Sequence, residues 1–174
     1  NAVGDYIRMA FPPNLANMKH VVINSAAQEE LALRTGITSE IIPNVIDFEN
    51  PPVIDESRSK QLREEIGLKP DDFVILQPTR IVQRKGIEHA IELIEELHDS
   101  RYKLVISHEA GDEGFEYREW LKDHAKKHKV DLIILKTKIA DPLNATNNGN
   151  CKYSLWDIYP HADLITYPSL YEGF

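Results

Sequence analysis

Short apolar runs alternate with longer amphipathic segments over most of the chain after residue 58. Four runs have the length and the near-continuous apolar composition of buried strands: 73–77, 102–107, 130–135 and 163–167. Between them, the spacing of apolar residues predicts helices over 86–98 and 113–129, and a shorter helix is expected over 153–161. Strands that alternate with helices predict an α/β fold, a Rossmann-like parallel sheet with helices on both faces.

The first 42 residues predict a smaller unit of strand and helix. The apolar run 21–24 has the length of a short strand, and Ser25 is placed to cap the helix that follows it. That helix is expected to run to about Arg34 and to end at Gly36.

A polar segment rich in proline separates this unit from the alternating region. Residues 39–58 include three prolines and several Asn and Asp residues, which predicts a linker with one short strand, followed by a helix over about 56–66. The expected organisation is a domain remnant, a linker and a second domain that is incomplete at its C-terminal end: 1–42, 43–58 and 59–174. The start without methionine and the stop just after a predicted strand favour a piece of a larger protein.

Charge and cysteine content narrow the classes of function. The net charge of −8 argues against general binding of nucleic acid or anionic membrane, because both need broad basic surfaces. The single cysteine, Cys151, excludes an internal disulfide. No apolar run reaches membrane-spanning length and no signal-peptide pattern is present, so the expected location is the cytoplasm.

The loops after the four predicted strands are the expected ligand site, because parallel sheets bind ligands beyond the carboxyl ends of their strands. We expect these loops to converge on one cleft: 78–86, 108–114, 136–142 and 168–174. In the first loop, Arg80 and Lys85 precede a helix N-terminus, a position that favours phosphate. Gly86 is expected to let the backbone approach the ligand, and Arg84 to lie at the surface. Solvated charge before a helix explains this cluster equally well.

The remaining candidates have weaker patterns. Glu172 in the last loop is a suitable acceptor for sugar hydroxyls, although spacing alone favours an ordinary loop glutamate. His124 and His128 have metal-ligand spacing on a helix, but their neighbours favour a solvated face. The chain has no glycine-rich dinucleotide fingerprint, no phosphate loop of the NTPases and no Asp-x-Asp. A nucleotide-diphosphate enzyme of this kind must neutralise its leaving group with side-chain cations, a role open to Arg80 and Lys85.

Three segments, in this order, resemble motifs of retaining glycosyltransferases of the GT-B fold, family 4 (group 1). Residues 41–49 (IIPNVIDFE) are similar to the interdomain PNGVD segment, with Val45 where glycine is usual. Residues 78–86 (PTRIVQRKG) resemble the GR-L-x-x-x-KG phosphate motif, and residues 155–174 resemble the block that ends in PS-x-x-EGFG. The resemblance covers nearly the whole chain and implies mostly the C-terminal, donor-binding domain of a GT-B enzyme, truncated.

The resemblance also implies roles for residues at matching positions. Arg80 and Lys85 would bind the donor diphosphate and stabilise it as it leaves, and Glu172 would contact the donor sugar. The second glutamate of the motif, which holds the ribose, would fall at position 180, beyond this chain. The other positions implied to bind the nucleotide sugar are Thr79, Gly86, Thr137, Lys138, Ile139, Gly173 and Phe174.

The activity implied is that of a hexosyltransferase, which moves a sugar from a nucleotide-diphosphate sugar to an acceptor hydroxyl with retention, without a cofactor or a bound metal. The implied partners are the sugar donor and a sugar or other hydroxyl acceptor, with no nucleic acid, and any peripheral membrane association would need regions outside this chain. Without the acceptor domain and the second glutamate, the isolated chain is expected to be inactive. The alternatives are a non-catalytic nucleotide-sugar-binding or scaffold module, and another GT-B enzyme such as a sugar-nucleotide epimerase.

Overall fold

The computed structural model describes residues 4–5, 9, 12–45, 47, 49–51, 53–108, 115–135, 139–140 and 153–172. The chain forms two compact units, which divide between Pro51 and Pro52. The first unit precedes this point, and the second extends to Glu172. That the first unit is the remnant of another domain of a larger enzyme stays a prediction.

The first unit contains a parallel strand pair and the helix that connects its strands. β1 (His20–Val22) pairs with β2 (Ser39–Ile41), and α2 (Ser25–Thr35) connects them. The prediction that Ser25 caps this helix is wrong by one residue. Asn24 is the cap: its backbone is extended and its side-chain oxygen accepts the N–H of Ala27 at 2.8 Å. The helix ends at Gly36 as predicted, in the left-handed conformation that glycine adopts without strain.

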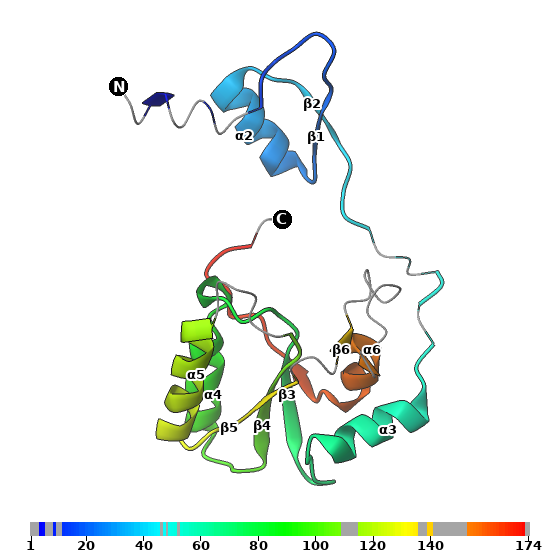
Figure 1. Ribbon diagram of the computed structural model, residues 1–174, viewed down its shortest axis with the longest axis vertical. Coiled ribbons are helices and arrows are strands. Elements are labelled where there is room, and N and C mark those ends of the chain that lie inside the picture. Colours follow the sequence, from blue (N-terminus) through cyan, green and yellow to red (C-terminus); the bar gives the residue numbers. More distant parts are fainter. Residues whose placement is uncertain are drawn as a thin grey trace. The chain divides into compact units, whose positions relative to one another are not determined.

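The second unit is built on a four-stranded parallel sheet (Figure 1). Its strands lie in the order β5-β4-β3-β8 and correspond to the four apolar runs of the sequence: β3 (Phe73–Gln77), β4 (Tyr102–Ile106), β5 (Asp131–Ile134) and β8 (Leu164–Ile165). The parallel α/β prediction is therefore confirmed, because every neighbouring pair in this sheet is parallel.

Helices cover both faces of this sheet, and alternate strand residues divide between the two sides. Ile75 of β3 and Leu104 of β4 pack against α4 (Ile87–Leu97) and α5 (Phe115–Lys127). Leu76 lies on the opposite face, which packs against α3 (Glu56–Glu65) and α6 (Leu155–Ile158). Figure 1 shows α4 and α5 on one side of the sheet and α3 and α6 on the other. Burial on both faces explains why β3 and β4 are almost continuously apolar.

Two local expectations differ from the structure. The short helix expected over 153–161 is preceded by β7 (Tyr153–Ser154), and α6 starts only at Leu155 because Ser154 and Asp157 form a reciprocal cap. The loop expected over 136–142 contains β6 (Ile139–Ala140), whose backbone pairs in parallel with β7. Two-residue strands are too short to leave a periodic pattern in the sequence.

Candidate functional site

The loops after β3 and β8 lie against each other at the carboxyl edge of the sheet. The two strands are parallel neighbours, so the chain leaves both at the same edge. The N–H of Leu170 donates to the carbonyl of Arg84 at 2.9 Å, which joins the loops directly. This contact confirms that two of the four predicted loops converge. Most of the other two, 108–114 and 136–142, lies outside the described residues, so their part of the cleft stays a prediction.

Gly86 fixes how closely these two loops approach. Its backbone has φ 59°, and it lies between a short 3-10 turn (Gln83–Lys85) and the first residue of α4. A side chain at this position would overlap the carbonyl oxygen of Pro168. The close backbone approach expected at Gly86 is therefore made to the neighbouring loop.

Lys85 and Glu172 form an ion pair across the two loops. The ammonium of Lys85 donates to Glu172 Oε1, and its side chain is only 13% exposed. Arg84 reaches the other carboxylate oxygen, with 3.4 Å between Nη1 and Oε2, and its guanidinium lies 5.8 Å from the ring centre of Tyr171. Arg84 was expected to be only a surface residue, but the structure adds it to this cluster.

The charge of Glu172 is stabilised by its neighbours. The hydrogen bond from Lys85 lowers the pKa of Glu172 to about 2, with smaller contributions from the Ser169 hydroxyl and the charge of Arg84. The carboxylate therefore stays ionised throughout the neutral range.

Arg80 differs from the other two cations of its loop. It is exposed, and its side chain makes no ion pair with any residue that the structure describes. Its neighbour Thr79 is buried, 6% exposed, and receives a contact from the side chain of Gln77. Arg80 therefore presents a solvated guanidinium in the loop after β3, and it can bind an anion without first breaking an internal pair.

The structure does not describe the side chains of five residues that the resemblance implies. Ile139 is described only through its backbone in β6, and the others lie outside the described residues: Thr137, Lys138, Gly173 and Phe174. Their assignment to the site stays a prediction.

Gln77 is a residue of this site that the sequence did not single out. It is the last residue of β3 and is fully buried, and its side-chain amide donates to the carbonyl of Lys85 at 2.9 Å. The available indication was a polar residue at the end of an otherwise apolar strand.

His124 and His128 turn toward helix α4. His124 Nε2 lies 4.0 Å from Glu92, His128 Nδ1 lies 2.5 Å from Glu95, and the two imidazole rings are 4.3 Å apart. Across the described part of the chain, no group of three or more His, Cys, Asp or Glu side chains is arranged to hold a metal ion. These histidines therefore connect α5 to α4.

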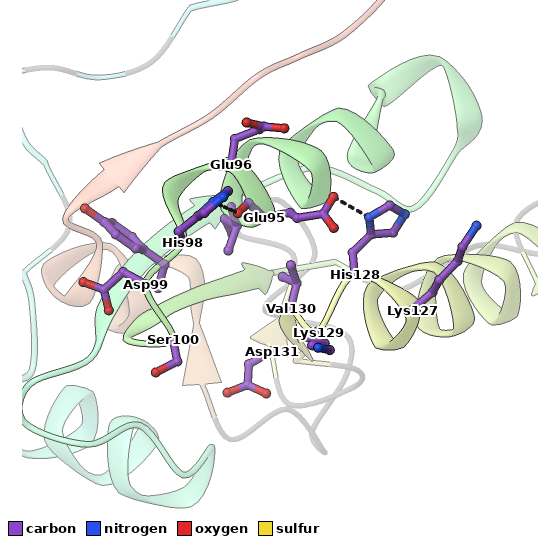
Figure 2. A pocket seen from close by; sticks show the side chains of 12 residues that line it. Glu95, Glu96, His98, Asp99, Ser100, Lys127, His128, Lys129, Val130 and Asp131 are labelled. Carbon is purple, nitrogen blue, oxygen red and sulfur yellow. Dashed lines mark hydrogen bonds and ion pairs between the residues drawn. The ribbon is translucent and has the colours of Figure 1, made fainter.

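A hollow of about 780 Å³ lies at the opposite end of the sheet, where β4 and β5 begin (Figure 2). Its wall combines acidic and basic side chains, among them Asp99, Lys129 and Asp131. Figure 2 shows that His128 and Glu95 on this wall are already paired. We place the site at the carboxyl edge instead, because parallel sheets bind their ligands there.

None of the helices described is long and apolar enough to cross a membrane.

Several known proteins are similar in sequence to most of this chain. Two curated relatives are named mannosylglucosylglycerate synthase: the one from Thermotoga maritima is 36% identical over 94% of this chain, and the one from Petrotoga mobilis is 35% identical over 100%. An alpha-galactosylglucosyldiacylglycerol synthase from Streptococcus pneumoniae is 24% identical over 90% of the chain. The chain spans only 40% and 44% of the length of the first two relatives.

A solved structure and a family model complete the comparison. The crystal structure of HepE from Anabaena, in complex with UDP and glucose, has a TM-score of 0.54. It is 17% identical, and the match covers 67% of this chain and 32% of HepE, a likeness that shows the fold. The family model described as "Glycosyl transferases group 1" matches residues 58–174, which include both loops of the site. The chain therefore belongs to the group 1 glycosyl transferases.

Proposed function

We propose that the protein with this chain transfers a hexose from a nucleotide-diphosphate sugar to an acceptor hydroxyl, and that the chain supplies most of the donor-binding domain. The observation that carries the proposal is the cluster at the carboxyl edge of β3 and β8, where Lys85 and Arg84 pair with Glu172 and the exposed Arg80 belongs to the same loop. The names of the relatives support the reaction class, because mannosylglucosylglycerate synthase is named for a product made of linked sugars. The HepE complex with UDP and glucose supports the donor class.

The charges of the cluster suit a diphosphate. Arg80, Arg84 and Lys85 carry three positive charges, and Glu172 removes one. The remaining two positive charges match the two negative charges of a nucleotide-diphosphate sugar. As the bond to the sugar breaks, further negative charge develops on the leaving diphosphate, and fixed cations at this position stabilise it. This charge balance makes leaving-group stabilisation the main catalytic role that we assign to the loop 78–86.

Glu172 suits the sugar side of the same donor. Its carboxylate is held ionised by Lys85, so it is an acceptor for two hydroxyl groups at neutral pH. The cations around Glu172 also keep it next to the proposed diphosphate, and a hexose attached to that diphosphate lies within its reach. Glu172 therefore orients the donor sugar in this proposal.

Retention of configuration and independence of a metal are the finer parts of the proposal. Retention rests on the similarity of residues 78–86 and 155–174 to the retaining family-4 motifs. Independence of a metal rests on the lack of Asp-x-Asp in the sequence together with the two cations that face the leaving group.

Transfer assays with UDP-, GDP- and ADP-hexoses test this function. The whole protein is expected to consume one donor class and to form an α-linked product from an α-linked donor, with activity unchanged by EDTA. Arg80→Ala should lower kcat at least tenfold, whereas the control Arg101→Ala, at the amino end of β4, should not. The 174-residue chain alone should bind the donor without turnover. Binding without turnover by the whole protein would instead favour a non-catalytic nucleotide-sugar-binding module.

A further inference from the structure

The buried position of the polar Gln77 side chain is unfavourable for the stability of the fold. It ends β3 between the two buried layers and has no exposed surface. Its Oε1 has no hydrogen-bond partner among the described residues. A buried polar atom without a partner destabilises a fold, so an apolar residue at this strand position would be the more stable choice. Departures from such local rules are concentrated at functional sites.

The NH₂ group of the same amide has hydrogen-bond partners. Nε2 donates to the carbonyl of Lys85 at 2.9 Å and lies 3.3 Å from the hydroxyl of Thr79. The carbonyl of Lys85 can only accept, so the side-chain atom that faces it must be the NH₂ group. This fixes the orientation of the amide and places its unpartnered oxygen on the other side.

The bond to Lys85 closes the cationic loop on its own strand. The loop leaves β3 after Gln77 and returns to it eight residues later, at the residue whose ammonium pairs with Glu172. The 3-10 turn directs the chain into this position, with the N–H of Lys85 bound to the carbonyl of Val82 at 3.0 Å. A fixed backbone at Lys85 limits where its ammonium can lie.

We propose that Gln77 is a positioning residue for the diphosphate site, and that it acts through the backbone of Lys85. This inference rests on the proposed function in so far as the anion is a donor diphosphate. In the free protein, the same hydrogen bond holds the ammonium of Lys85 against Glu172. Loss of the bond lets the loop shift, which weakens both the ion pair and the contact with an anion.

The first test needs no ligand. In Gln77→Met, a change of similar volume that removes the donor, the pKa of the Glu172 carboxyl should rise from about 2 toward the ordinary value for glutamate. Leu76→Met is the matched control, because it changes the neighbouring buried residue of β3, which faces the other layer. Carboxyl ¹³C NMR titration measures both variants. An unchanged pKa of Glu172 in a folded Gln77→Met protein would overturn the proposal.

The second test uses UDP and GDP, with uridine and guanosine as phosphate-free probes. Gln77→Met should weaken calorimetric binding of the diphosphate about tenfold and leave nucleoside binding unchanged. Equal losses for both probes, or for the Leu76→Met control, would indicate a merely structural role and contradict the proposal. If the unaltered protein binds neither diphosphate, the proposed function fails, while the titration of Glu172 still decides whether Gln77 positions Lys85.

Gln77→Glu separates hydrogen bonding from packing. A neutral carboxyl group donates to the Lys85 carbonyl as the amide does, whereas the ionised form cannot. Burial raises the pKa of a carboxyl at this position. The Glu variant should therefore bind UDP or GDP like the unaltered protein at low pH and lose affinity as the pH rises. A pH profile parallel to that of the unaltered protein would overturn the proposal.

Discussion

Replacement of Gly86 by alanine tests whether the two loops of the site are held together as the structure shows. Two penalties add at this position. The backbone φ of 59° costs an alanine about 1–2 kcal/mol, because the left-handed conformation brings Cβ close to the following carbonyl. The new methyl group would also overlap the carbonyl oxygen of Pro168, and forced overpacking of this kind costs about 1–3 kcal/mol more. The total expected loss in the free energy of unfolding is about 2–5 kcal/mol.

The chain contains a matched control for the first penalty. Gly67 has φ 77°, and a Cβ there would meet no atom within 4 Å. Gly67→Ala should therefore cost only about 1–2 kcal/mol. Urea unfolding of both variants gives the difference directly, and thermal unfolding should show a fall of about 2–4 °C for each kcal/mol. Equal losses for the two variants would refute the close approach of Gly86 to Pro168.

Two further predictions concern ion pairs. The pKa of Glu172 is lowered from 4.5 to about 2, so its contribution to stability is present above pH 4.5 and is lost as the pH falls toward 2. Glu172→Gln should therefore flatten the pH dependence of urea unfolding between these two values. An unchanged profile would contradict the pairing with Lys85. Asp157→Ala removes a buried carboxylate that binds Arg58 at 3.0 Å and caps α6. It should lower the free energy of unfolding in urea by about 2–4 kcal/mol. Arg58→Ala changes a half-exposed residue of the same pair and should lower it less.

The strands and the site loop could be predicted from the sequence because their determinants are local. The apolar runs of β3 and β4 are nearly continuous because both faces of these two strands are buried, and Gly86 marks the turn that leads into α4. The same local pattern placed Arg80 and Lys85 at the carboxyl edge. Position along the strand was enough for this inference, because parallel topology then fixes which loops meet.

What the sequence did not predict depends on distant contacts or on small differences between neighbours. Arg84 joins the site through Glu172, which lies 88 positions away, and through the neighbouring residues of the same distant loop, so no local pattern could indicate it. The role of Gln77 depends on its hydrogen bond to the backbone carbonyl of Lys85, and a pattern of side chains in the sequence does not indicate such a bond. Asn24 and Ser25 are both good N-caps, and only the extended backbone at Asn24 decides between them.

The central claim is that Lys85 binds the diphosphate of the donor, and calorimetry tests it most directly. The measurement compares UDP and GDP with their nucleosides on the unaltered protein, on Lys85→Ala and on the control Lys122→Ala, which changes an exposed lysine of α5. A charge-assisted hydrogen bond contributes about 1.5–3 kcal/mol. Lys85→Ala should therefore weaken diphosphate binding by about 10- to 100-fold, with nucleoside binding and the control unchanged. Diphosphate affinity that is the same in Lys85→Ala and in the unaltered protein would contradict the assignment of this site.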